Sequence, residues 1–177
     1  WAVRDPAHIR ILRRGDAASF QPHRLEALLE CPEAFGSTFE EDSLLSLDVV
    51  ADRLEVRTEV SRRVVFGAFD GNRLIGFVGC MQEQKLKARH KAMIWGTYVV
   101  PDARGRGVGK ALLSRLVEHV STWPEVALLT LTVVERAHAA RALYAAAGFE
   151  RFGREPDGLR QDGVSDTVEY MALVLPR

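Results

Sequence analysis

Hydrophobic positions along the chain follow two periods, and the changes between them predict an alternation of strands and helices. Apolar residues spaced three and four apart indicate amphipathic helices, whereas alternating or short continuous apolar runs indicate strands. The first pattern predicts helices within residues 16–29, 47–59, 108–121 and 137–147. The second predicts strands at residues 9–12, 62–69, 74–82, 92–100, 127–134, 149–153 and 164–175.

Glycine, proline and aspartate residues indicate where these elements begin and end. Asp16 is the expected cap of the first helix. Pro22 falls inside the same stretch and predicts a break or a second helix start, since proline lacks an N–H. Asp70-Gly71-Asn72 is the predicted turn of one hairpin. Pro156-Asp157-Gly158 is the predicted turn of a second hairpin, which closes the chain.

The order of the elements indicates the fold class. It runs strand, two helices, a meander of three strands, helix, strand, helix and two strands. The strand–helix–strand unit over residues 92–134 requires a right-handed crossover, which makes its two strands parallel neighbours. The strand at 127–134 is apolar on both faces and suits a sheet covered on both sides. We therefore expect one α/β domain across residues 1–177, with a mixed central sheet and helices on both faces.

Composition narrows the class of protein. The 177 residues fit one domain by length and carry 24 Lys plus Arg against 24 Asp plus Glu. This balance favours neither nucleic acid nor a membrane surface as partner, and no apolar run approaches the ~20 residues of a membrane helix. No signal-peptide pattern opens the sequence, and Cys31 and Cys80 show no metal or redox spacing. We therefore expect a cytoplasmic protein that needs no metal.

A glycine-rich stretch between strand 92–100 and helix 108–121 carries the clearest chemistry. Glycine at every second position permits positive φ and lets a ligand approach the bare backbone. The start of the following helix offers free N–H groups and the positive end of the helix dipole, which suit a phosphate. Three cationic side chains lie among the glycines. The predicted diphosphate cradle consists of Arg104, Gly105, Arg106, Gly107, Val108, Gly109 and Lys110.

The spacing of the glycines distinguishes between phosphate motifs. A P-loop would need glycine where the chain has Arg104 and a hydroxyl residue where it has Ala111. A dinucleotide fingerprint, counted from the first glycine, would need a third glycine at Lys110. The pattern that fits is Arg-x-x-Gly-x-Gly, ending at Gly107 and Gly109. This stretch closely resembles the coenzyme A pyrophosphate loop of the GNAT superfamily, the acyl-CoA-dependent N-acyltransferases.

The resemblance spans nearly the whole chain and implies a cofactor, acetyl-CoA, as acyl donor. In the superfamily, the pantetheine arm of the cofactor adds to the central sheet as a pseudo-strand. The corresponding backbone here is that of Tyr98, Val99 and Val100. For this to happen, the central strand and the parallel strand after it must splay apart. The resemblance therefore implies a GNAT-like fold with a splayed parallel pair.

A second resemblance lies in the segment Ala139-Ala140-Arg141-Ala142-Leu143-Tyr144, followed by Gly148-Phe149. In the superfamily the matching tyrosine commonly protonates the departing thiolate, which implies this role for Tyr144. Phenol and thiol have pKa values near 10 and 8.5, so the proton transfer is chemically reasonable. Tyr144 could instead be a half-buried aromatic that fixes its helix to the sheet. Many relatives carry Asn where this chain has Ala137, which removes one contact to pantetheine.

The base that accepts the proton of the amine stays unassigned. The segment from Ala92 to Val100 contains no carboxylate. The nearest candidates are Glu83, at the end of the preceding strand, and Glu135, just past the next parallel strand. Glu41, in an acidic segment, could hold the ammonium group of the substrate. Each of these residues could equally be an exposed surface charge.

The resemblance implies transfer of an acetyl group to a primary amine by direct attack. The acceptor could be a small molecule or an amino group of a protein. The alternative is a domain that has lost catalysis and binds acyl-CoA as a sensor or partner module, since Ala137 departs from the family pattern. A homodimer is also expected, because relatives often pair through their C-terminal strands and Tyr170 to Leu175 would be an apolar edge that needs cover.

Overall fold

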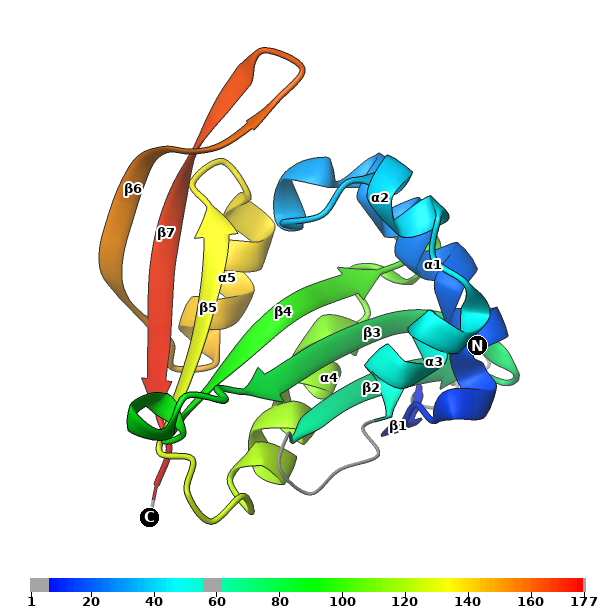
Figure 1. Ribbon diagram of the computed structural model, residues 1–177, viewed down its shortest axis with the longest axis horizontal. Coiled ribbons are helices and arrows are strands. Elements are labelled where there is room, and N and C mark those ends of the chain that lie inside the picture. The colour runs from blue at the N-terminus through cyan, green and yellow to red at the C-terminus, as the bar shows by residue number, and fades with distance from the viewer. Residues whose placement is uncertain (1–6, 56–61, 177) are drawn as a thin grey trace.

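The computed structural model describes residues 7–55 and 62–176. Its seven strands form one sheet in the order β1-β2-β3-β4-β5-β7-β6 (Figure 1). The strands are β1 (His8–Ile11), β2 (Arg63–Asp70), β3 (Arg73–Gln82), β4 (Lys91–Val99), β5 (Leu128–Val134), β6 (Glu150–Gln161) and β7 (Val164–Val174). The α-helices are α1 (Ala17–Glu30), α2 (Phe39–Ser43), α3 (Leu47–Leu54), α4 (Val108–Val120) and α5 (His138–Ala146).

Helices cover both faces of the sheet, as the sequence predicts. Helices α1, α2 and α3 lie over one face, and α4 and α5 lie over the other (Figure 1). Phe20 of α1 packs edge-on against Phe77 of β3, with ring centroids 4.9 Å apart. On the opposite face, His119 of α4 packs edge-on against Phe66 of β2 at 5.5 Å. The expected mixed α/β fold is therefore confirmed.

The predicted splay of the parallel pair is present. β4 and β5 pair in parallel from Lys91↔Leu128 to Ile94↔Leu131. Pairing stops there, although β4 continues to Val99 and β5 to Val134. The two strands diverge toward their carboxyl ends in Figure 1. The second half of β4 therefore has β3 on one side and an open edge on the other.

The prediction for the first helix was wrong in two respects. Helix α1 runs unbroken from Ala17 to Glu30 with Pro22 inside it. Pro22 lies in the second turn, so the helix loses one internal N–H donor, while Phe20 and Gln21 stay buried beside it. The carboxylate of Asp16 does not cap α1. It accepts hydrogen bonds from the Arg10 guanidinium (2.8 and 2.9 Å) and the Arg13 N–H (2.7 Å).

The closing hairpin turns later than predicted. Its turn is Asp162-Gly163, where φ is 49° and 78°, and two-residue hairpin loops favour such positive values. The segment 156–158 is instead a bulge inside β6, where pairing with β7 skips from Glu155 to Leu159. β7 therefore lies between β5 and β6. The predicted apolar edge at residues 170–175 is internal, and the argument for a homodimer through that edge was wrong.

Three further predictions concern the end of one helix, membrane spans and metal binding. The helix predicted over residues 47–59 is α3, which ends at Leu54, and its predicted end lies outside the described residues. None of the helices in the described part of the chain is long and apolar enough to span a membrane. Across residues 7–55 and 62–176, no group of three or more His, Cys, Asp or Glu side chains could hold a metal ion.

Candidate active site

A cavity of about 430 Å³ lies where β4 and β5 diverge. Its walls come from the middle of β4, the end of β5 and one face of α5 that includes Ala140 and Tyr144. The loop between α1 and α2 and the hairpin of β6 and β7 complete them. Segments from the beginning, middle and end of the chain therefore meet around the splayed pair, as in Figure 1. A cavity of this size accommodates a small ligand.

The glycine-rich loop leads into α4 as an open cradle. Gly107 is the N-cap of α4 with φ of 78°, and Gly105 has φ of 72°. A Cβ built on either glycine would meet no heavy atom of the described residues within 4 Å. The Ala111 N–H donates to the Gly107 carbonyl (3.0 Å), so the amides of residues 108–110 are the end groups that a helix leaves without an internal acceptor.

The three cations of the cradle do not have the same role. Arg106 and Lys110 are exposed and form no ion pair with another described residue. Arg104 instead pairs with Glu30 of α1 at 2.7 Å, and its Nε donates to the Val99 carbonyl at 2.9 Å. Arg104 therefore fastens the loop to α1 and to the end of β4. The charge free to meet a diphosphate comes from Arg106 and Lys110.

The cradle adjoins the open edge of β4. A Cβ on Gly109 would lie 3.4 Å from Leu143 of α5 and 3.8 Å from Val99, so the loop, α5 and the end of β4 meet there. Tyr98 is buried beside it, and its hydroxyl donates to Glu30 at 2.5 Å. Burial raises the pKa of Tyr98. The Val100 N–H donates to Ile75 of β3 (3.0 Å).

Tyr144 lies in the gap between the splayed strands. Its hydroxyl donates to Thr97 Oγ1 of β4 at 3.1 Å, and its ring packs edge-on against Phe149 at 6.0 Å. The residue lines the cavity and is only 7% exposed, so it is more deeply buried than the half-buried alternative assumed. Burial raises the pKa of Tyr144, although the bond to Thr97 opposes this. The phenol is therefore protonated at neutral pH.

A buried ion pair holds α5, and with it Tyr144, against the sheet. Glu169 of β7 is 2% exposed and accepts from Arg141 of α5 at 2.8 and 3.0 Å. Arg151 of β6 also donates to it at 2.9 Å. Burial alone would raise the pKa of Glu169, but the bonds to the two arginines outweigh it, and the pKa is lowered. Glu169 is therefore ionised at neutral pH and links three elements.

The carboxylates predicted from the sequence lie away from the cavity. None of the described residues that line it is Glu83, Glu135 or Glu41. The backbone of Glu83 bonds to Lys91, at the paired beginning of β4 rather than at the splay. Glu135 accepts two hydrogen bonds from Arg154 (3.1 and 3.0 Å), which lower its pKa. Glu41 accepts from the Thr38 N–H (2.8 Å) and so caps α2.

Two carboxylates that the sequence did not indicate do line the cavity, Glu33 and Glu155. Glu33 belongs to a short 3-10 helix, Pro32–Ala34, and lies 4.0 Å from Arg136, just past β5. Glu155 is on β6 and accepts a hydrogen bond from the Tyr170 hydroxyl. Tertiary folding brings both residues to the cavity, and no short sequence motif around either of them predicts this position.

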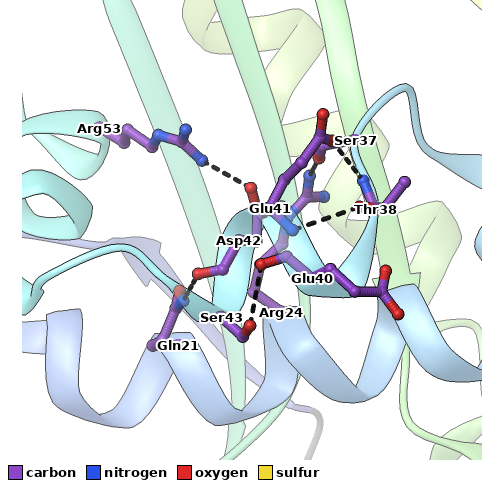
Figure 2. A network of polar contacts seen from close by, with 9 residues as sticks. All are labelled: Gln21, Arg24, Ser37, Thr38, Glu40, Glu41, Asp42, Ser43 and Arg53. Carbon is purple, nitrogen blue, oxygen red and sulfur yellow. Dashed lines mark hydrogen bonds and ion pairs between the residues drawn. The ribbon is translucent and has the colours of Figure 1, made fainter.

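A buried polar network forms the wall on the side of α1 (Figure 2). Arg24 donates through Nε to Asp42 (2.9 Å) and through Nη2 to the Ser37 hydroxyl (2.8 Å). Asp42 also accepts from Arg53 of α3 at 3.2 Å, and its backbone carbonyl accepts from Gln21 at 2.8 Å. The network fixes α1, α3 and the loop at 31–38 relative to one another.

Comparison with known proteins places this geometry in a family. A sequence profile of the acetyltransferase (GNAT) family matches residues 25–149. The chain belongs to the GNAT family of acetyltransferases. No curated protein sequence matches it.

Solved structures of GNAT proteins share its fold at low sequence identity. yncA, a putative acetyltransferase from Salmonella typhimurium with its cofactor acetyl-CoA, has a TM-score of 0.83 and 19% identity, covering 97% of this chain and 95% of that one. A phosphinothricin acetyltransferase from Sinorhizobium meliloti in complex with acetyl-CoA has a TM-score of 0.82 and 23% identity, and the match covers 96% of this chain and 89% of that one. A ribosomal-protein-alanine N-acetyltransferase from Brucella melitensis has a TM-score of 0.81 and 22% identity, and the match covers 95% of this chain and 99% of that one.

Proposed function

We propose that this GNAT protein transfers an acetyl group from acetyl-CoA to a primary amine that binds in the cavity between β4 and β5. The observation that carries the proposal is the arrangement of the splayed pair. An open cradle lies at one end of the gap, and a protonated, buried phenol lies within it. Acetyl-CoA complexes of two structures with the same fold support the choice of donor.

The residues present fit coenzyme A. The free amides at the start of α4, together with Arg106 and Lys110, would hold its diphosphate. The open edge at the end of β4, beside Tyr98 and Val99, would accept the pantetheine arm along the backbone, whereas the Val100 N–H is already paired with Ile75 of β3. Positive φ at two glycines leaves the cradle clear of side chains. When bound there, the cofactor supplies an acetyl thioester.

The protein would supply a proton donor and a proton acceptor around the reacting groups. Tyr144 keeps its proton on the phenol oxygen at neutral pH and can give it to the sulfur that leaves. An alkylamine is mostly protonated at pH 7 and must lose a proton before it can attack. Glu33 and Glu155 line the cavity and are the candidates to accept that proton. Glu33 is favoured because Glu155 already accepts from Tyr170.

The alternative function is binding of acyl-CoA without catalysis. It is favoured by Ala137, which lines the cavity at the start of α5 and offers no side-chain polar group. One experiment separates the two functions. Thiol release from acetyl-CoA is followed over a panel of alkylamines, polyamines, amino acids and peptides, and binding of acetyl-CoA is titrated calorimetrically. Amine-dependent thiol release supports the transferase, whereas binding without release with any amine supports the sensor.

A further inference from the structure

One donor of the buried Arg24 guanidinium has no partner among the described residues. Its Nε and Nη2 bond to Asp42 and Ser37, as Figure 2 shows. Nη1 has no hydrogen-bond partner among the residues that the structure describes, and it is shielded from solvent. Arg24 as a whole is only 7% exposed. The Phe35 ring lies 4.5 Å from the guanidinium carbon, but it offers no oxygen to accept an N–H bond. A buried donor left unpaired is costly, more so on a charged group.

This free donor lies in the wall of the cavity. A Cβ built on Gly96 of β4 would be 3.5 Å from Nη1, and Gly96 and Arg24 line the same cavity. Because residue 96 has no side chain, the space beside Nη1 stays open. Trp95 lines the cavity next to it, and its indole Nε1 is also buried without a partner among the described residues. Arg24 and Trp95, each with a buried donor that has no partner among the described residues, therefore both line this cavity.

The charge around this wall is positive. Arg24, Arg53 and Arg63 line an adjoining cavity of about 280 Å³ together with Trp95, and none of its described lining residues is acidic. The nearby carboxylate of Asp42 is shared by Arg24 and Arg53. Across the gap, near the end of β5 and on β6, the cavity carries the carboxylates of Glu33 and Glu155. The cavity therefore has a cationic side and an anionic side.

We propose that the acceptor is a small primary amine that also carries a carboxylate, which Arg24 Nη1 and Trp95 Nε1 bind. The proposal rests on the proposed transferase function, because it names the class of amine that the same cavity selects. A guanidinium N–H matches a carboxylate oxygen in charge and geometry. The ammonium end would then lie toward Glu33 and Glu155. A cavity of about 430 Å³ that also admits the thioester has room for an acceptor about the size of an amino acid.

The test compares matched acceptors. The probes are the α-amino acids, glycine among them, and the ω-amino acids β-alanine and 4-aminobutyrate, each beside its carboxamide and its decarboxylated amine. We expect kcat/KM for at least one amino acid to exceed that of its partners that lack the carboxylate about 10- to 100-fold, the value of one charge-assisted hydrogen bond. Arg24→Lys keeps a positive charge beside Asp42 but removes the guanidinium. It should abolish this preference, so that the carboxylate acceptor falls to the kcat/KM of its partners that lack the carboxylate.

A control variant and the pattern of acetylated acceptors together decide whether Arg24 binds a carboxylate. Arg53→Lys is the matched control, because Arg53 shares Asp42 but does not line the gap between β4 and β5, and it should retain the preference. Turnover of amines that lack a carboxylate, with no gain from a carboxylate, would overturn the inference and leave the transferase function intact. If no amine is acetylated, the transferase function fails. Calorimetry with the same probes then decides: binding of carboxylates that Arg24→Lys loses supports the site, and absence of such binding overturns it.

Discussion

Replacement of Gly107 by valine should abolish binding of acetyl-CoA while the protein stays folded. Gly107 has φ of 78°, and a β-branched residue at such an angle costs about 1–2 kcal/mol. For a domain of this size that corresponds to a fall in Tm of roughly 2–8 °C. The valine side chain would fill the open space in front of the amides of α4. Loss of even one amide–phosphate bond should weaken binding about 10- to 100-fold.

The chain offers a closely matched control at Gly163. This residue also has φ of 78° and open space around it, but it lies in the turn between β6 and β7. Gly163→Val should therefore cost a similar amount of stability and leave the affinity for acetyl-CoA unchanged. The two variants separate strain in the backbone from obstruction of the cradle.

Three measurements on each variant suffice. Far-UV circular dichroism reports the fold, calorimetric scanning reports Tm, and isothermal titration reports the Kd for acetyl-CoA. Unchanged affinity in Gly107→Val with an intact spectrum would refute the cradle. An equal loss of affinity in both variants would show that destabilisation, rather than obstruction, weakens binding.

The remaining predictions concern proton transfer and the support of α5. Tyr144→Phe should lower kcat at least about tenfold and leave the Kd for acetyl-CoA unchanged, and full turnover would make Tyr144 a packing residue. Glu33→Gln should also lower kcat at least about tenfold, whereas Glu135→Gln, whose carboxylate Arg154 holds, should not, and a normal rate for Glu33→Gln would favour Glu155 as the base. Glu169 has a lowered pKa, so its contribution to stability is present above the ordinary value of 4.5 and is lost as pH falls through its value in the folded state. Chemical denaturation between pH 3 and 7 should therefore show a steeper acid loss for the native protein than for Glu169→Gln, and equal slopes would contradict this.

The features that could be predicted from sequence are those that short segments determine. The glycine spacing at 105–109, the strand before it and the amphipathic helix after it are all contained in about thirty consecutive residues. The right-handed crossover then makes β4 and β5 parallel neighbours. Tyr144 follows from the same logic, because it lies on the helix directly after the second strand of that crossover.

Other features depend on competition between distant segments. The closing hairpin contains two Asp-Gly pairs, at 157–158 and 162–163, and each has positive φ at aspartate. Only the pairing of β6 with β7 decides that the second pair turns the chain and that the first becomes a bulge. Likewise, Arg104 looks like a free phosphate ligand in the sequence. Its partner Glu30 is 74 positions away, so no local pattern shows that its charge is already engaged.

The contrast between features set by short segments and features set by distant segments also applies to the two halves of the proposed site. The donor half consists of β4, the loop at 104–110, α4 and α5, and it lies within the stretch at 25–149 that identifies the family. The acceptor half also uses Glu33 and Trp95 from within that stretch, but it takes Arg24 from before the stretch and Glu155 from after it. Membership of the family therefore constrains how an acyl donor is held but says little about which amine is chosen. If the proposed acceptor site is right, acceptor specificity should follow exchanges of α1 and of the hairpin of β6 and β7, while affinity for acetyl-CoA stays constant.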